Sequence, residues 1–402
     1  MKEKEAALRR IECVDAMPSV RVNRRAADRI GSGHPWIFAS DVISAGQAGA
    51  GDVVRVVDPK GRAVGTAHYS TTSQIALRLL SSRVETVNEK FLHDRIRTAY
   101  EYRQRFVRDS DAYRLVHAEG DFLPGLVVDR YADWLVVQLL NQGMDRMRLE
   151  IVSALQKIIQ PRGILARNDV PSRTKESLPQ EKTVFAGEIP DRVEFLMNGL
   201  RWSADLLGGQ KTGSFLDQRE NYLAAAHYAR GEALDCFSGS GGFAMHLARR
   251  CDSVEAIDSS APALANLGEN AGRNGISNIT RQEADVLEYL PGLVHARRQF
   301  DIVIVDPPAF TKSRGAVEGA VRGYKEVNLR ALRLVKPGGI LVSCSCSHHM
   351  TETHLLEVIA AAALDTRKTL RVLERRTQAQ DHPILLTVPE THYLKCLIFE
   401  VL

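Results

Sequence analysis

The chain has 402 residues, of which 44% are hydrophobic and 25% are charged. Such a chain can bury the cores of two or three domains, which excludes an intrinsically disordered protein. Its 53 lysines and arginines only slightly exceed its 49 acidic residues, so a nucleic-acid partner would be bound by local basic patches and not by overall charge.

Cysteine usage and the N-terminal segment predict a cytoplasmic protein. The six cysteines are spread irregularly, which does not make a disulfide framework, so we expect reduced thiols. Residues 1–12 mix lysine, glutamate and arginine without an apolar centre, unlike a signal or transit peptide. No run approaches the roughly twenty apolar residues of a membrane span, and we expect no membrane partner.

The first part of the chain is predicted to be a helical extension, residues 1–17, followed by a small β-barrel over residues 18–88. Short β-prone runs alternate there with turns such as Asp-Pro-Lys-Gly at 58–61. Four arginines precede an aromatic side chain, Trp36, and this combination suits phosphate contact and stacking on RNA. The alternative is that Trp36 and Phe38 are core residues and the arginines are only solvated. The four are Arg21, Arg24, Arg25 and Arg29.

Residues 89–190 are predicted to form a small α+β domain. A helix over residues 88–108 links it to the first domain, and its arginines form either an exposed face or an extension of an RNA track. These are Arg95, Arg97, Arg103, Arg105 and Arg108. The other elements expected are strands near 113–118, 125–129, 134–140 and 163–167 and a helix near 145–159.

A third domain, residues 191–402, opens with a predicted hairpin. Asn198-Gly199 lies between the β-prone runs 193–197 and 200–204, and this dipeptide is a strong signal for a two-residue turn. A polar loop at 209–221 then leads into a helix.

Residues 232–243 (Glu-Ala-Leu-Asp-Cys-Phe-Ser-Gly-Ser-Gly-Gly-Phe) are predicted to form a strand, a tight loop and the start of a helix. Glycines let a backbone approach a ligand closely, and a helix N-terminus favours a carboxylate or a phosphate. Such a loop is weak evidence by itself, because many α/β folds need glycines to turn. The candidate ligand-binding residues are Asp235, Phe237, Ser238, Gly239 and Gly241.

Three later strands each end in a carboxylate. Asp258 ends residues 253–258, at about the separation where nucleotide-binding units place an acid against ribose hydroxyls. Asp285 ends a strand near 278–285 and would accept a hydrogen bond from an adenine amino group. Asp306 follows a fully apolar strand, as a buried parallel sheet requires, and two prolines then take the chain out of the sheet.

The glycine loop, Asp258, Asp285 and the Asp-Pro-Pro-Ala-Phe run at 306–310 resemble the motifs of class I S-adenosylmethionine-dependent methyltransferases. More narrowly, the chain from about residue 21 resembles the bacterial family of PUA-domain large-subunit ribosomal RNA cytosine-5 methyltransferases. That likeness lies in residues 33–38, 166–173 and 209–221.

The resemblance implies an α/β fold in which a Rossmann-like methyltransferase domain follows a PUA-like β-barrel and a small α+β domain. It also implies S-adenosylmethionine as cofactor and large-subunit rRNA as partner, with a homodimer as one candidate assembly. Asp217, Arg219 and Glu220 would equally suit a salt-bridge set at a helix start. The residues carried over are Phe215, Gln218 and Arg219 for the cofactor and Arg21, Arg24, Arg25, His34 and Phe310 for RNA.

A strand predicted over residues 340–347 carries two cysteines and is followed by His348 and His349. A zinc site is one interpretation, but no second pair of ligands stands nearby, so we expect no metal. Buried thiols without a role are another. The third is a nucleophile, which the family has in the middle of a Ser-Cys-Ser such as residues 345–347. We therefore predict that Cys346 is the nucleophile, with Cys344 in reserve.

Methylation of carbon 5 of a cytosine needs covalent help. A thiolate added to carbon 6 turns carbon 5 into an enamine that attacks the methyl sulfonium, after which a base removes the carbon-5 proton and the thiol leaves. We expect Asp306 to hydrogen-bond the cytosine edge and Phe310 to stack on the base, which must be unpaired or flipped. Many relatives carry a second cysteine where Ala309 follows Pro308 here, so the elimination base stays unassigned.

Two alternative functions stay open. Asp-Pro-Pro-aromatic loops also resemble those of methyltransferases that act on exocyclic amino groups of guanine or adenine and need no cysteine. A non-catalytic RNA-binding assembly factor is the other.

The rest of the chain is predicted to add an antiparallel pair of strands, near 369–376 and 393–401, at the sheet edge. Between them His382 is either an active-site contact or, by default, a structural residue.

Overall fold

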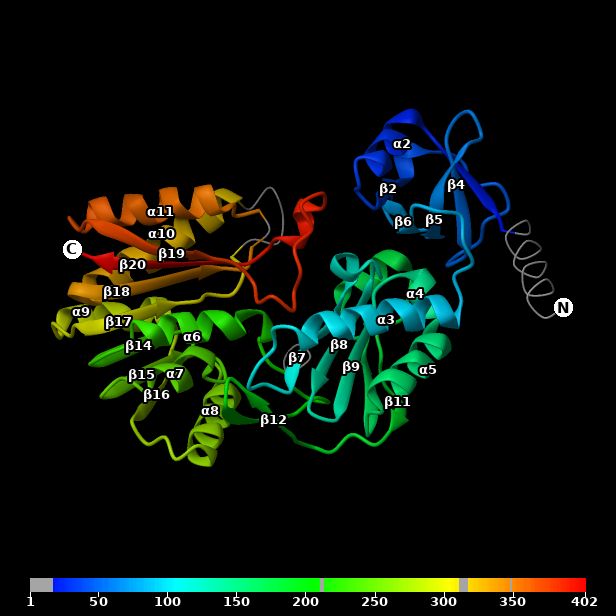
Figure 1. The fold of residues 1–402 in the computed structure, drawn as a ribbon. Helices are drawn as coiled ribbons and strands as arrows, with labels where there is room; N and C mark the ends of the chain where they lie inside the picture. The colour runs from blue at the N-terminus through cyan, green and yellow to red at the C-terminus, as the bar shows by residue number, and fades with distance from the viewer. Residues whose placement is uncertain (1–16, 210–212, 311–316, 348) are drawn as a thin grey trace. The chain divides into compact units, whose positions relative to one another are not determined.

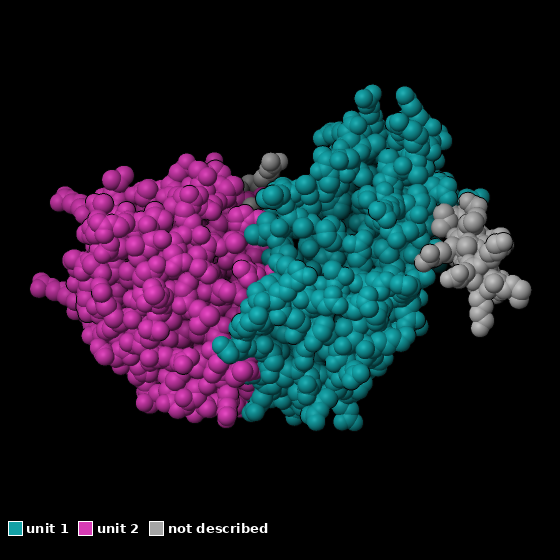
Figure 2. Space-filling view, viewed as in Figure 1, with its two compact units in different colours: residues 1–195, 205–213, 381–391 teal, residues 196–204, 214–380, 392–402 magenta. Residues whose placement is uncertain are grey.

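The computed structural model describes residues 17–209, 213–310, 317–347 and 349–402. The chain forms two compact units, shown in different colours in Figure 2. Unit 1 comprises Met1–Phe195, Asp205–Gly213 and Asp381–Thr391, and unit 2 comprises Leu196–Ala204, Ser214–Gln380 and His392–Leu402. The predicted helical extension lies, apart from Met17, outside the described residues.

A six-stranded sheet with one helix forms the N-terminal part of unit 1 (Figure 1). The helix, α2 (Arg24–Gly31), begins where the Asn23 side chain accepts a hydrogen bond from Ala26 N at 2.9 Å. Val20, Ile37 and Leu77 are fully buried beneath it. The sheet has the order β2-β6-β5-β4-β1-β3 and consists of β1 (Ser19–Val22), β2 (Trp36–Phe38), β3 (Val42–Ser44), β4 (Val53–Val57), β5 (Ala63–Tyr69) and β6 (Ile75–Ser81).

A five-stranded sheet with the order β11-β10-β9-β8-β7 forms the middle of the chain, and helices α3 and α5 pack on it. The predicted helix at 145–159 is divided into two, because Asn141 caps the first piece and Met147 leaves helical geometry. The 3₁₀ segment η3 (Pro171–Glu176) and β11 were not predicted. The other elements are α3 (Glu89–Gln104), β7 (Ala112–His117), β8 (Leu126–Tyr131), β9 (Trp134–Leu139), α4 (Gln142–Arg146), α5 (Arg148–Ile159), β10 (Gly163–Arg167) and β11 (Lys182–Gly187).

Helix α3 corrects one expectation about its arginines. Arg103 has no exposed surface, so it belongs neither to an exposed face nor to an RNA track. Its guanidinium donates to both carboxylate oxygens of Asp121, at 2.5 and 2.7 Å, and to the carbonyl oxygens of Ala99, Arg114 and Asp381. All five of its N–H groups are therefore used inside unit 1.

The segment Asp381–Thr391 belongs to unit 1, although it lies between two strands of unit 2 in the sequence. The Asp381 carboxylate accepts from Arg114 N at 2.8 Å and contacts His382 Nδ1 at 2.9 Å. The His382 ring is buried and lies 5.1 Å from the His117 ring, centre to centre. His382 thus has the structural hydrogen bond that was its default interpretation.

The predicted hairpin opens the last part of the chain as β12 (Val193–Met197) and β13 (Leu200–Ala204). Asn198 and Gly199 both have positive φ, 54° and 72°, as a type I′ turn requires. The Asn198 side chain donates to the carbonyl oxygen of Arg219 at 2.8 Å, which ties the turn to the start of α6 (Arg219–His227).

Unit 2 is built on a seven-stranded sheet with the order β16-β15-β14-β17-β18-β20-β19 (Figure 1). Strands β14 to β18 are mutually parallel, and β20 is antiparallel to both of its neighbours, so the predicted antiparallel pair at the edge is confirmed. The strands are β14 (Glu232–Cys236), β15 (Ser253–Asp258), β16 (Ile279–Glu283), β17 (Phe300–Val305), β18 (Val335–Ser345), β19 (Leu370–Arg376) and β20 (Lys395–Val401).

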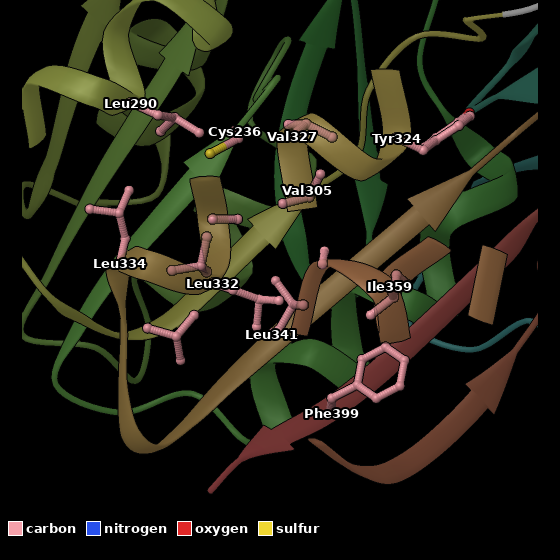
Figure 3. Packing of buried hydrophobic residues seen from close by; sticks show 14 of the residues in the cluster. Cys236, Leu290, Val305, Tyr324, Val327, Leu332, Leu334, Leu341, Ile359 and Phe399 are labelled. Carbon is pink, nitrogen blue, oxygen red and sulfur yellow. The ribbon is translucent and has the colours of Figure 1, made fainter. Parts of the chain in front are cut away.

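Helices cover both faces of this sheet. Side chains of α9 (Val286–His295), α10 (Val317–Leu334) and α11 (Glu352–Asp365) join Val305, Leu341 and Phe399 of the strands in one buried cluster (Figure 3). Helices α7 (Gly242–Leu247) and α8 (Ala261–Arg273) contact β14 or β15 but, among the described residues, add none to that cluster. They therefore lie on the other face, which confirms a Rossmann-like α/β domain.

Candidate active site

The order of strands places the candidate site at the carboxyl ends of β14, β17 and β18. Following β14, the chain adds β15 and β16 on one side and then crosses to β17 and β18 on the other. In open α/β sheets, ligands bind at such a switch point, outside the carboxyl ends of the strands. Cys236 pairs with Val305, and Val305 pairs with Ser343, so the glycine loop, Asp306 and Cys346 follow neighbouring strand ends.

The glycine loop leaves β14 through residues with positive φ. Phe237, Gly239 and Gly241 have φ values of 62°, 54° and 90°. A Cβ at Gly241 would lie 2.2 Å from Leu267 Cδ1, so this glycine is required by packing against α8. A Cβ at Gly239 would meet no described atom within 4 Å, so the backbone here faces open space that a ligand can use.

Asp235 is a buried acid at the base of this loop. Its Oδ2 accepts hydrogen bonds from Ser238 Oγ at 2.7 Å and from Ala244 N at 2.9 Å. Among the described residues no donor reaches its buried Oδ1. Burial raises the pKa of Asp235 to about 7, although the two hydrogen bonds act in the opposite direction. The buried Oδ1 of Asp235 is therefore a suitable hydrogen-bond acceptor for a cationic group of a ligand.

Asp258 and Asp285 end up in different local roles. Asp258 accepts from Gly239 N at 2.8 Å and from Ser260 N at 2.8 Å, so it holds the glycine loop. The predicted strand before Asp285 ends at Glu283, because Asp285 caps α9 and accepts from Glu288 N at 3.1 Å. Each carboxylate still has further lone pairs for a ligand.

The loop before α6 places Gln218 against the candidate catalytic acid. Gln218, which is 2% exposed, donates from Nε2 to Asp306 Oδ2 at 3.0 Å. Arg219 is buried and pairs with Glu220 at 2.6 Å, which agrees with the salt-bridge alternative for this residue. Asp217 instead accepts from the Tyr393 hydroxyl at 2.8 Å. Phe215 is exposed, and residues 210–212 of the same loop lie outside the described part of the chain.

The two cysteines of β18 lie in different surroundings. Strand β18 ends at Ser345, so the alternation that would place both thiols on one face stops before Cys346. Cys344 is fully buried opposite Cys396, and burial raises the pKa of its thiol well above the ordinary value. Cys346 is half-buried and therefore the more accessible of the two.

Two polar residues beside Cys346 were not singled out from the sequence. Tyr324 of α10 accepts from Ser345 Oγ at 2.8 Å and lies 3.1 Å from Ser347 Oγ. Lys395 of β20 donates to the carbonyl oxygen of Ser347 at 2.7 Å. The only sequence signal for Lys395 is a charged residue at the start of an otherwise apolar strand.

The Asp-Pro-Pro loop continues from Asp306 to Phe310, and residues 311–316 lie outside the described part. The Phe310 ring is half-buried and packs edge-on against the Tyr324 ring, with centres 4.9 Å apart. Its partner is thus the tyrosine that contacts the two serines flanking Cys346.

Four of the five predicted RNA-binding residues, all but Phe310, belong to unit 1. Arg21 is exposed on β1, which lies between β3 and β4 in the N-terminal sheet, and Arg24 and Arg25 are exposed on α2. His34 is engaged, because Nδ1 accepts from Trp36 N at 3.2 Å and Nε2 lies 3.2 Å from Glu390. Trp36 is half-buried and donates to Glu119 at 2.9 Å. The three arginines are therefore more accessible to a ligand than His34 and Trp36.

A metal centre has no support in the described part of the chain, where no three histidine, cysteine or acidic side chains gather as ligands would. His348 lies outside the described residues, and His349 is exposed. Within the same residues, no helix is both long and apolar enough to cross a membrane.

Comparison with known proteins agrees with this architecture. A PUA-like domain model matches residues 20–82, and a methyltransferase domain model matches residues 229–385. A protein from Streptococcus mutans, assigned as a SAM-dependent methyltransferase, shares the fold with a TM-score of 0.81 and 20% identity, over 96% of this chain and 100% of that one.

Curated relatives extend over nearly the whole chain. Ribosomal RNA large subunit methyltransferase I of Shewanella denitrificans is 38% identical over 378 residues, which cover 92% of this chain and 95% of that protein. The protein of the same name from Klebsiella pneumoniae is 37% identical over 372 residues, 90% of this chain and 93% of that one. The chain therefore belongs to the family of the ribosomal RNA large subunit methyltransferases I.

Proposed function

We propose that this protein transfers a methyl group from S-adenosylmethionine to carbon 5 of a cytosine in large-subunit ribosomal RNA. The observation that carries the proposal is the position of Cys346, a half-buried thiol directly after β18, next to the strand that ends before Asp306. Methylation at carbon 5 needs such a thiol, whereas methylation of an amino group does not. The relatives, which are ribosomal RNA large subunit methyltransferases, support the class of RNA.

The residues of the glycine loop fit the cofactor, which when bound supplies an electrophilic methyl group on its sulfonium. Asp235 Oδ1 is the proposed acceptor for the amino group of the cofactor, since no described donor reaches it. Asp258 would take the ribose hydroxyls, and the second oxygen of Asp285 the adenine amino group. Open space at Gly239 admits a ligand against the backbone. Phe215, Gln218, Phe237 and Ser238 complete the proposed cofactor surface, and Arg219 would act on it through its pair with Glu220.

The target base would be bound between the Asp306 loop and Cys346. The Cys346 thiolate adds to carbon 6 of the cytosine, and carbon 5 then receives the methyl group. Asp306, held in place by Gln218, is the proposed hydrogen-bond partner of the cytosine edge. Phe310, braced by Tyr324, is the proposed stacking partner. The base has to be unpaired or flipped to enter.

Unit 1 is the proposed RNA-binding part. The exposed side chains of Arg21, Arg24 and Arg25 suit phosphate contacts, which weaken as salt rises. His34 is better placed to orient the Trp36 region than to contact RNA, because both of its nitrogens already have partners.

The proposal is tested with the whole protein, radiolabelled S-adenosylmethionine and unmodified ribosomal RNA, followed by nucleoside analysis. Wild type and Cys344→Ala should form 5-methylcytosine, and Cys346→Ala should form none. The Cys344 variant is the matched control, because that thiol is buried in β18, two residues before Cys346. Transfer by Cys346→Ala at the wild-type rate would contradict the covalent route.

The second candidate function is methylation of an exocyclic amino group. The hydrogen bond from Gln218 to Asp306 favours it, since it holds an Asp-Pro-Pro-aromatic loop in a fixed position without any thiol. In the same assay this function would give a methylated guanine or adenine in wild type and Cys346→Ala alike. A non-catalytic assembly factor would bind the cofactor and methylate no RNA.

A further inference from the structure

Lys395 is a buried cation at the candidate active site that the proposed chemistry has not yet used. Its side chain is 3% exposed. The amino group donates to the carbonyl oxygen of Ser347 at 2.7 Å and to that of Tyr393 at 2.8 Å. A buried lysine that only neutralised a carboxylate would have an acid as hydrogen-bond partner, whereas both hydrogen-bond partners of Lys395 among the described residues are neutral carbonyls. The cation therefore needs another explanation.

The strand register places Lys395 beside the nucleophile. Lys395 lies directly opposite Ser345 in the antiparallel pair of β18 and β20. The backbone of Lys395 pairs with Ser345, the residue before Cys346, whereas its amino group donates to the carbonyl oxygen of Ser347, the residue after Cys346. The Lys395 ammonium interacts electrostatically with Cys346. Two of its N–H bonds are directed at carbonyls, so the nitrogen keeps one further position.

We propose that Lys395 is the positioning residue that accepts the thiol proton of Cys346 and holds the resulting thiolate. This role rests on the proposed function, because it activates the nucleophile of that reaction. The S–H bond breaks and leaves its electron pair on sulfur. The proton forms a third N–H bond with the lone pair of the Lys395 amine. Thiolate and ammonium then form an ion pair, and the ammonium keeps its two bonds to the carbonyls.

The charged groups around Lys395 are compatible with this proton transfer. Burial lowers the pKa of Lys395 to about 8, while Cys346 and Glu352 act in the opposite direction. Glu352 at the start of α11 is itself paired with Arg375 of β19, which limits its effect on the lysine. Burial also raises the pKa of Tyr324, so this neighbour stays a neutral hydroxyl. Asp306, which acts to raise the pKa of Tyr324, is held by Gln218. An amine with a pKa near 8 exchanges a proton readily at neutral pH.

Reactivity of the thiol tests the proposal without RNA or cofactor. The rate at which iodoacetamide alkylates Cys346 is measured against pH by site-resolved mass spectrometry, in wild type and in variants of the full chain. Lys395→Met and Lys395→Gln remove the base, and the shorter glutamine keeps an uncharged N–H donor. Lys395→Arg keeps a permanent cation. Lys368→Met is the matched control, since Lys368 is a lysine of unit 2 that likewise donates to two carbonyls, those of Leu332 and Val335.

We expect Cys346 of the two neutral variants to titrate at least about one pH unit higher than in wild type, which makes alkylation about tenfold slower at pH 7. Lys368→Met should react as wild type does. Lys395→Arg can hold the thiolate but cannot accept its proton, so its Cys346 should titrate between wild type and the two neutral variants. If circular dichroism shows that Lys395→Met does not fold, the titration of Cys346 in Lys395→Gln tests the assignment. Neutral variants that titrate as wild type does would overturn the assignment. That result is separate from the nucleoside assay, in which failure of wild type to form 5-methylcytosine would overturn the proposed function instead.

Discussion

Gln218 and Asp306 are joined by a hydrogen bond of 3.0 Å between residues 88 positions apart in the sequence. The Gln218 amide is oriented from both ends, because its Oε1 accepts from Asn221 Nδ2 at 2.6 Å. The side chain of the proposed catalytic acid is thereby fixed by the loop that precedes α6. This loop also carries Phe215, so the proposed cofactor surface and the proposed catalytic acid share one loop.

Gln218→Met should reduce methyl transfer more than it reduces stability. The methionine fills a similar volume but cannot donate to Asp306, and misplacement of a catalytic group by an ångström costs up to about 100-fold in rate. We expect kcat/KM on ribosomal RNA to fall about 10- to 100-fold. Gln282→Met, at the edge strand β16, is the control and should keep wild-type activity. Equal rates for both variants would show that the bond to Asp306 has no role in the reaction.

Three glycine-to-alanine variants separate packing from cofactor binding. Gly239→Ala and Gly275→Ala each add a methyl group at positive φ where no described atom lies within 4 Å, so each should cost about 1 kcal/mol of stability. Gly239→Ala should also weaken binding of S-adenosylhomocysteine, because its methyl group occupies the proposed ligand space. Gly241→Ala should lose both stability and binding of S-adenosylhomocysteine, since its methyl group meets Leu267. Calorimetric titration and denaturant unfolding measure the two effects, and undiminished binding by Gly239→Ala would contradict this cofactor site.

Asp235 should make stability fall as pH rises. Burial raises its pKa from 3.8 to about 7, so between these values the folded state binds a proton that the unfolded state has lost. The stabilising proton is fully present below pH 4 and is lost as pH rises through 7. We expect Asp235→Asn, which imitates the protonated acid, to gain about 1.4 kcal/mol relative to wild type for each pH unit across this window. Denaturant unfolding at several pH values measures how the free energy of unfolding changes with pH. The same change in wild type and in Asp235→Asn would contradict the prediction.

Arg103 and Arg105 give a matched pair on one helix. Arg103→Met leaves Asp121 as a buried, unpaired carboxylate and should destabilise unit 1 by about 3–5 kcal/mol. Arg105 is exposed, so Arg105→Met should change stability by less than about 0.5 kcal/mol. Hydrogen exchange of β7 and of the segment Asp381–Thr391 reports the difference. Similar exchange in both variants would mean that the Arg103 hydrogen bonds do not hold this segment.

Local pattern in the sequence determined most of the elements of this protein, and the family resemblance of its motifs predicted the fold class. Apolar runs closed by Asp258 and Asp306, and the Asn198-Gly199 turn, predict their structures because strand burial and positive φ depend on near neighbours in sequence. The order of the glycine loop and the three acids then indicated the site, since parallel strands that follow one another end at the same edge.

Tertiary structure alone decided what surrounds the proposed nucleophile. Lys395 lies beside Cys346 because β20 inserts antiparallel between β18 and β19, and that register is set by contacts between distant segments. Arg103 is read as a surface residue from its helix and becomes buried only when Asp121 and Asp381 close over it. Pairings of this kind depend on which faces pack together, and no local periodicity encodes that choice.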